Sequence, residues 1–192
     1  MAENIVVLEF RTSKEWIGWL AKNHAVSTGE WVRLAKKGCS RPMLGYKEAL
    51  EAALCQGWID AQTRGESETA WLKRFTPRGK KSIWSKINCA HALRLIEAGR
   101  MEPAGLEEVE RAKADGRWAA AYDGPRTATV PEDLAAALAG ASGEARAFFG
   151  ELKSNNRYAI LWRIQTTKTA TTRAKRIGQM IEMLERKETF HP

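Results

Sequence analysis

The chain of 192 residues contains no apolar run that approaches the roughly 18 residues a membrane-spanning helix requires. The opening residues, MAENIVVLEFRTSKEW, have neither a basic leading segment nor a cleavable apolar one, so a secretory signal is not expected. These absences predict a protein that does not insert into a membrane. With 44% apolar residues, the chain instead has enough apolar side chains to bury a sizeable core.

Cysteine and histidine are also scarce. The three cysteines, Cys39, Cys55 and Cys89, are odd in number and form no CxxC pair, which predicts reduced thiols and a cytoplasmic location. The three histidines have no metal-ligand spacing with one another or with the cysteines, so neither a metal nor a cofactor is expected. Cys55 lies near the end of an apolar-faced helix and is interpreted as a small buried side chain rather than a nucleophile.

Basic residues, in contrast, are abundant and clustered. The formal net charge is +8, and two stretches hold six basic residues and no acidic one, Lys73–Lys86 and Arg157–Arg176. Such runs attract phosphates or acidic partners, but they are equally typical of a solvated face that binds nothing. Charge alone leaves both interpretations open.

The N-terminal half has the pattern of an α+β fold. A strand is expected at Ile5–Phe10, a helix from Ser13 to about His24, and a second strand at about 31–36. A further helix is expected over Tyr46–Leu54. Its apolar stripe consists of Tyr46, Ala49, Leu50, Ala53 and Leu54, with Lys47, Glu48 and Glu51 pointing away from it.

A β-hairpin is predicted after Gly57, which ends the helix in the left-handed conformation. The segments WIDAQTRG and AWLKRFT form its strands, and the polar GESET segment forms its turn. Simple alternation places Trp58, Asp60, Gln62 and Arg64 on one face of the first strand. Placed beside the strand at 31–36, the hairpin gives a small, mostly antiparallel sheet.

The C-terminal half has the pattern of helices throughout. Helices are expected from about Ser82 to Gly99, from Pro103 to Gly116, and from Pro131 to Gly140. Three more follow, at about 143–152, from Ser154 onward, and at about 171–187. With Asp123–Val130 as the linker, the fold class is α+β, with an α+β domain at 1–122 and a helical domain at 131–192.

Several runs of residues carry a resemblance to one family. EAALCQGWIDA, RFTPRGKKSIWSKIN, GRMEPAGLEEVERAKADGRW and VPEDL, with TKTATTRAKRI and its TR-x-x-RI pattern, resemble the YdeI/OmpD-associated, or bacteriocin-protection, family over nearly the whole chain. Members are described by association with antimicrobial-peptide resistance and an outer-membrane porin, so the resemblance implies a binding or protection protein without a defined reaction. Gln56 and Gln165–Thr167 depart from the family's usual residues.

Three functions remain open at this point. The first is a binding module that recognises an anionic small molecule or a protein partner through the basic, tryptophan-rich surface at 58–88. The second is nucleic-acid binding, because tryptophans interleaved with arginines and lysines suit base stacking and phosphate contacts. The third is an enzyme acting on a small anionic substrate, with Asp60 as the base. No oligomeric state is implied.

The predicted ligand-binding residues belong to the central stretch of the chain. They are Trp58, Asp60, Arg74, Arg78, Trp84, Lys86 and Asn88. Asp60 has a structural interpretation as well, in which it pairs with Arg74 or Arg78 across the hairpin and fixes its register. Trp58 and Trp84 either stack on a ligand or cover the sheet.

Overall fold

The computed structural model describes residues 6–192, so Ile5 of the first predicted strand lies outside the described residues. The chain forms two compact units. The first, the sheet unit, comprises the residues up to Ser82 together with Asn88–Ala120. The second, the helical unit, comprises Ile83–Ile87 together with Ala121–Pro192. The domain boundaries expected from the sequence, 1–122 and 131–192, stay a prediction.

The sheet unit is built on a four-stranded sheet with the order β1-β2-β4-β3. Its strands are β1 (Val7–Glu9), β2 (Glu30–Ala35), β3 (Trp58–Gly65) and β4 (Ala70–Pro77). The expected hairpin is present as β3 and β4, and β4 lies antiparallel to β2. β1 pairs in parallel with β2, because the chain crosses over through a helix between them, so the sheet is mixed.

An irregularity in β3 changes which side chains share a face. Asp60 lies opposite Phe75, but Thr63 lies opposite Lys73, so the register shifts between Asp60 and Thr63. Directly opposite residues point to the same side of a sheet, and an extra residue on one strand therefore reverses the alternation. The prediction that Gln62 and Arg64 share a face with Trp58 and Asp60 is wrong for this reason.

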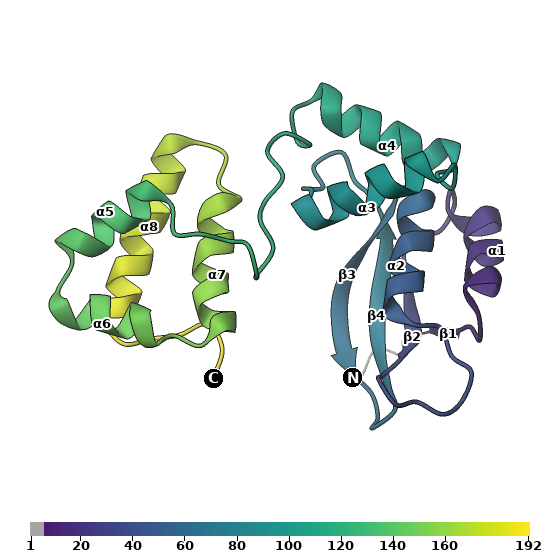
Figure 1. The fold of residues 1–192 in the computed structure, drawn as a ribbon, viewed down its shortest axis with the longest axis horizontal. Helices are drawn as coiled ribbons and strands as arrows, with labels where there is room; N and C mark the ends of the chain where they lie inside the picture. The colour runs from purple at the N-terminus through teal and green to yellow at the C-terminus, as the bar shows by residue number, and fades with distance from the viewer. Residues whose placement is uncertain (1–5) are drawn as a thin grey trace. The chain divides into compact units, whose positions relative to one another are not determined.

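Helices α1 (Ser13–Asn23) and α2 (Tyr46–Cys55) cover one face of the sheet (Figure 1). Trp16 on α1 is fully buried between them, with ring centroids 5.7 Å from Phe75 and 6.4 Å from Trp58. Its indole Nε1 donates to the carbonyl oxygen of Ala49 on α2 at 3.1 Å. The aromatic core of this unit thus has its buried polar group satisfied.

The predicted pattern of buried and exposed side chains on helix α2 is wrong at two positions, Tyr46 and Glu51. Ala49, Leu50, Ala53 and Leu54 are buried, whereas Tyr46, at the start of the helix, is 37% exposed. Glu51, expected to point to solvent, is only 7% exposed. Gly57 follows the helix with φ of +72°, the left-handed conformation predicted for it.

Helices α3 (Lys86–Glu97) and α4 (Pro103–Ala114) pack at the C-terminal end of α2 (Figure 1). Here the backbone N–H of Glu102 donates to the carbonyl oxygen of Cys55. α3 begins at Lys86 and not at Ser82, because Ser85 forms an isolated β-bridge with Tyr122. The flanking N–H groups of Lys86 and Tyr122 are bonded in that bridge, so the preceding residues are not helical.

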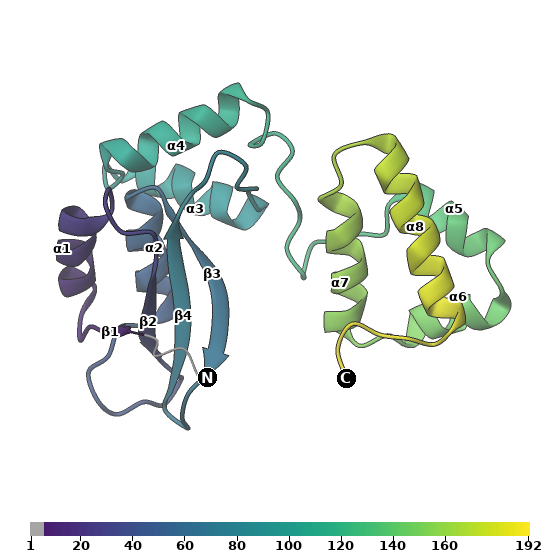
Figure 2. The ribbon, with the colours of Figure 1, turned by 180° about the vertical axis from the view of Figure 1, so that it is seen from behind.

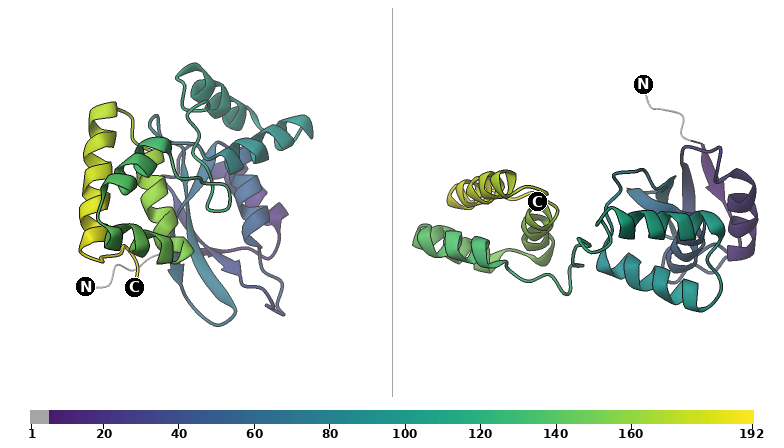
Figure 3. Two further views of the ribbon diagram at one scale, coloured as in Figure 1. Left: turned by 60° about the vertical axis from the view of Figure 1, so that its left-hand side comes forward. Right: turned by 90° about the horizontal axis from the view of Figure 1, so that it is seen from above.

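The helical unit contains four further helices, and each end that the sequence predicted lies within two residues of the observed one. They are α5 (Glu132–Gly140), α6 (Gly143–Glu151), α7 (Ser154–Gln165) and α8 (Ala170–Glu185). α8 packs against the other three, as the two views in Figure 3 show. The shared core includes Leu134, Leu138, Phe149, Ile160, Ile164, Ile177, Met180 and Leu184.

Candidate functional site

Three of the seven predicted ligand-binding residues are buried. Trp58 is 1% exposed, Trp84 2% and Arg78 5%. The indole Nε1 of Trp58 donates to the carbonyl oxygen of His24 at 3.1 Å, which fixes the ring inside the core of the sheet unit. Trp58 therefore covers the sheet, one of the two roles expected for it.

Asp60 pairs with neither of the two predicted alternatives, Arg74 and Arg78, but with Lys73. Its Oδ2 lies 2.7 Å from Nζ of Lys73 and accepts a hydrogen bond from the hydroxyl of Tyr46 at 3.0 Å. Lys73 also donates to the carbonyl oxygen of Ala61 and the hydroxyl of Thr63. The predicted pairing with Arg74 is wrong because Arg74, next to Lys73 along β4, points to the opposite face.

The other predicted residues lie in both units. Nη1 of Arg74 is 3.4 Å from Oε1 of Gln62, and Asn88 is half-buried, both in the sheet unit. Lys86 belongs to the helical unit and forms an ion pair with Asp123 at 2.9 Å. A binding role for the seven residues stays a prediction.

The sheet face opposite α1 and α2 carries basic and aromatic side chains; Figure 2 shows the sheet from behind. Trp31 on β2 lies opposite Arg74 on β4, and the guanidinium of Arg64 on β3 lies 4.9 Å from the Trp31 ring centroid. We call Trp31, Arg64, Arg74 and Gln62 the arginine face. The bulge in β3 creates it, because it turns Arg64 toward Trp31.

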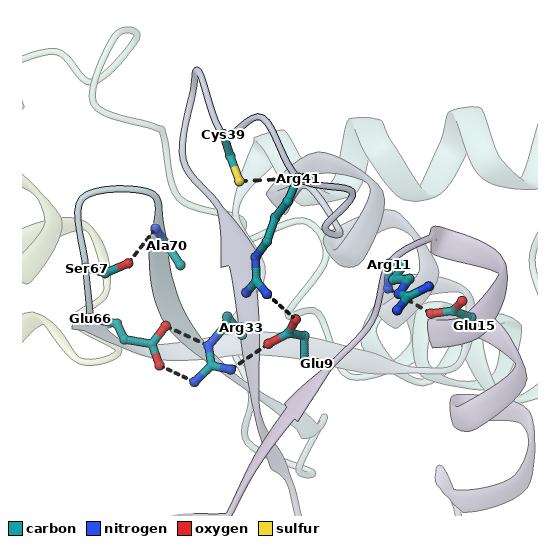
Figure 4. Close-up of polar contacts among 9 residues, drawn as sticks. All are labelled: Glu9, Arg11, Glu15, Arg33, Cys39, Arg41, Glu66, Ser67 and Ala70. Carbon is teal, nitrogen blue, oxygen red and sulfur yellow. Dashed lines mark hydrogen bonds and ion pairs between the residues drawn. The ribbon is translucent and has the colours of Figure 1, made fainter.

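Beside the arginine face, Arg33 is neutralised by two glutamates (Figure 4). Its Nε and Nη2 contact Glu66 at 2.7 and 2.5 Å, and its Nη1 contacts Glu9 at 2.5 Å. Glu9 also pairs with Arg41 at 3.1 Å. The hydrogen bond from Arg33 holds the pKa of Glu9 below its ordinary value, so this network carries paired charges that join β1, β2 and the hairpin turn.

The helical unit contains two adjoining cavities beside α7, of about 460 and 420 Å³. Both are lined by Trp162 and Arg163. The rest of the larger cavity is lined by Pro125, Ser154, Asn155, Tyr158, Ala159 and His191. The rest of the smaller cavity is lined by Thr166, Arg176, Gln179, Met180 and Phe190.

Two arginines converge on the smaller cavity. Arg163 lies with its guanidinium carbon 3.6 Å from the ring centroid of Phe190, and its Nη1 donates to the carbonyl oxygen of Ala159 at 2.9 Å. Nη1 of Arg176 donates to the carbonyl oxygen of Arg163 at 2.7 Å. Burial and the charge of Arg176 lower the pKa of Arg163. Among residues 6–192, neither arginine forms an ion pair with a carboxylate.

The walls of these cavities are held by buried polar contacts. Asn156, 4% exposed, exchanges two hydrogen bonds with the backbone of His191, at 3.0 and 2.9 Å. The hydroxyl of Tyr158 donates to the carbonyl oxygen of Asp123, and burial raises the pKa of Tyr158 to about 12. These contacts hold His191 and Tyr158, which line the larger cavity, in place.

Sequence reasoning predicted no binding role for any of these cavity residues. The acid-free run Arg157–Arg176 was visible, and it contains Trp162 and both arginines. The sequence signal that could have pointed to this site is the overlap of the acid-free run with the TR-x-x-RI pattern, whose second arginine is Arg176. What the sequence does not show is that Phe190 and His191 pack back against α7.

Residues 6–192 contain no group of three or more histidine, cysteine, aspartate or glutamate side chains placed to hold a metal ion. Within the same range, no helix is both long and apolar enough to cross a bilayer.

Fold and site together define a class, an α+β sheet unit combined with a small helical unit that carries basic, aromatic-lined cavities. Residues 8–108, more than half of the chain, match the family model described as Domain of unknown function (DUF8412), and the chain belongs to this family. Residues 127–187 match the model described as Bacteriocin-protection, YdeI or OmpD-Associated.

The predicted family resemblance is therefore confirmed in the C-terminal part of the chain, and the match to that family covers residues 127–187. The runs EAALCQGWIDA and RFTPRGKKSIWSKIN, also assigned to that resemblance, lie in the part matched by the other family model. No curated protein matches the chain, and no solved structure matches it.

Proposed function

We propose that the protein is a binding module that recognises a small anionic ligand at Arg163 and Arg176. One observation carries the proposal: these two arginines line the same cavity and, among the described residues, neither is paired with a carboxylate. Two like charges at one site repel each other, and an anion bound between them relieves that repulsion. The site should therefore bind an anion more tightly than a neutral or cationic ligand.

The chemistry of the walls narrows the ligand further. A guanidinium can hold a carboxylate or phosphate with two parallel hydrogen bonds, and both arginines retain N–H groups beyond the one each donates to a backbone carbonyl. Trp162 and Phe190 add aromatic surface at the same place. A ligand that combines an anionic group with a planar apolar part suits these walls best.

The description of the matched family names bacteriocin protection. We extend that setting to this protein as part of the proposal. With a net charge of +8, the chain repels cationic peptides, so direct capture of such a peptide is disfavoured. Recognition of an anionic partner is the role that the charge favours, as the basic, tryptophan-rich sequence also suggested.

The proposal is tested by isothermal titration calorimetry with inorganic phosphate, benzoate and phenyl phosphate. Arg176→Gln should weaken binding of phenyl phosphate at least about tenfold, which corresponds to about 1.4 kcal/mol. Lys175→Gln removes the same charge from an exposed neighbouring position of α8 and should leave the affinity nearly unchanged. Absence of saturable binding by the unmodified protein, or equal losses in both variants, contradicts the proposal.

A further inference from the structure

The arginine face of the sheet unit has features that the proposed function does not use. α1 and α2 pack on the side of Trp58 and Phe75, and Trp31 points to the other side of the sheet. Trp31 and Arg74 are half-buried, whereas Gln62 and Arg64 are exposed. Trp31 on β2 thus shares one face of the sheet with Arg74 on the adjacent strand β4 and Arg64 on the next strand, β3.

The charges on this face are unevenly neutralised. Arg33 is held by Glu9 and Glu66, so its charge is satisfied within the protein. Arg64, in contrast, lies over the Trp31 ring, and Arg74 contacts the neutral amide of Gln62. In the part of the chain that the structure describes, neither residue has a carboxylate within ion-pair distance. The face therefore presents unpaired positive charge beside an aromatic ring.

We propose that the arginine face binds single-stranded nucleic acid. Exposed bases stack on aromatic rings and on guanidinium planes, while arginines bind the phosphates between them. Arg64 already lies over the Trp31 ring. A base can therefore stack on the outer face of the Arg64 guanidinium. Arg74, opposite Trp31 on the next strand, is placed to hold a neighbouring phosphate.

A single strand fits this arrangement better than a duplex does. The bases of a duplex are stacked on one another and expose only their edges in the grooves, which a ring lying on a sheet cannot stack against. Because Arg33 beside the face is already paired with Glu9 and Glu66, only Arg64 and Arg74 attract phosphates to the arginine face. This arrangement favours a ligand with few phosphates and accessible bases.

The test is fluorescence anisotropy with a labelled single-stranded oligonucleotide of about 12 nucleotides, within the range one such surface covers. Arg64→Gln and Arg74→Gln should each weaken binding at least about fivefold. Each should also lower the slope of log K against log salt by about 0.7, the change expected when one phosphate contact to a single strand is lost. The same sequence as a duplex should bind more weakly than the single strand.

Two further variants separate this site from general attraction. Lys80→Gln removes an equal charge from an exposed position of the same unit and should change neither the affinity nor the salt slope. Trp31→Phe should bind better than Trp31→Leu, with the thermal unfolding of both variants measured to confirm that they fold. No binding, tighter binding of the duplex, or an equal loss in Lys80→Gln overturns the proposal.

Discussion

Nη1 of Arg176 on α8 donates a hydrogen bond of 2.7 Å to the backbone carbonyl oxygen of Arg163 on α7. Arg173, one turn earlier on α8, donates in the same way to the carbonyl oxygen of Ile164 at 2.8 Å. The last carbonyls of a helix lack intrahelical partners and attract positive charge. Both arginines of the TR-x-x-RI pattern therefore cap α7, and Ile177 of the pattern lies in the core.

Arg173→Lys should destabilise the helical unit although the charge is kept. Arg173 binds Asp133 through two parallel contacts, Nε to Oδ2 at 2.6 Å and Nη2 to Oδ1 at 2.9 Å, which lysine cannot reproduce. We expect a loss of about 1–2 kcal/mol in the free energy of unfolding, measured with urea. Arg126→Lys, at an exposed position, is the control and should cost less than about 0.5 kcal/mol.

The same ion pair should contribute to stability in a pH-dependent way. The hydrogen bonds from Arg173 lower the pKa of Asp133 in the folded protein. The pair therefore stabilises the fold above the unfolded-state pKa of about 3.9, and this contribution is lost as the pH falls through the lower folded value. In Asp133→Asn the drop in stability between about pH 5 and pH 2 should be smaller than in the unmodified protein.

Glu51→Gln should destabilise the sheet unit. The carboxylate of Glu51 accepts from Arg94 at 2.6 Å and from Arg100 at 3.2 Å, and it joins α2 to α3 and to the segment that follows. Burial alone would raise the pKa of Glu51, but the two arginines lower it overall. The carboxylate therefore stabilises the fold above about pH 4.3, and this contribution is lost as the pH falls through the folded pKa.

For Glu51→Gln we expect a loss of about 1–3 kcal/mol at pH 7, because a neutral amide replaces a buried, doubly bonded carboxylate. Urea unfolding at pH 7 and pH 4 measures both the loss and its pH dependence. Glu97→Gln, on the exposed side of α3, serves as the control. A Glu51 variant as stable as this control would show that the two ion pairs contribute nothing.

The three thiols should differ in reactivity. Cys55 and Cys89 are 7% and 8% exposed, and burial raises the pKa of both, that of Cys89 to about 11. Cys39 is only half-buried. A thiol-reactive disulfide reagent at pH 7.5 should therefore modify one thiol rapidly, and Cys39→Ser should remove that phase. Rapid modification of a second thiol in the folded protein would contradict the buried interpretation of Cys55.

Much of the fold could be predicted because its signals are local. The helix at Tyr46–Cys55 follows from apolar spacing, Gly57 from the need for a left-handed residue after the helix, and the hairpin from two β-rich runs around a polar turn. Each signal lies within a few residues of the structure that it specifies. The parallel pairing of β1 with β2 is not local, and the sequence gives no comparable sign of it.

The partners of charged residues could not be predicted, because they depend on contacts distant in sequence. Glu51 was expected at the surface, since a carboxylate is costly to bury alone, but Arg94 and Arg100 approach it from 43 and 49 residues away. Gln62 and Arg64 were assigned to the wrong face because alternation cannot reveal a bulge. The Arg163 cavity depends likewise on Phe190, which packs back onto α7.

The contact between α2 and α4 depends on a glycine at one position. A Cβ atom added to Gly105 would lie 2.8 Å from the carbonyl oxygen of Leu54 and closer still to that of Cys55. Both are backbone atoms at the end of α2, so no flexible side chain can move aside. Gly105→Ala should therefore push the two helices apart and lower the free energy of unfolding by about 1–3 kcal/mol or more.

Gly178→Ala is the matched control for this substitution. Gly178 lies in the interior of α8, and a Cβ atom there would meet nothing within 4 Å. Alanine has the higher helix propensity, so this variant should gain about 0.5–1 kcal/mol. If close packing requires glycine at position 105, urea unfolding should show a lower free energy of unfolding for Gly105→Ala and a higher one for Gly178→Ala. A gain in stability for Gly105→Ala would show that α2 and α4 do not approach each other this closely.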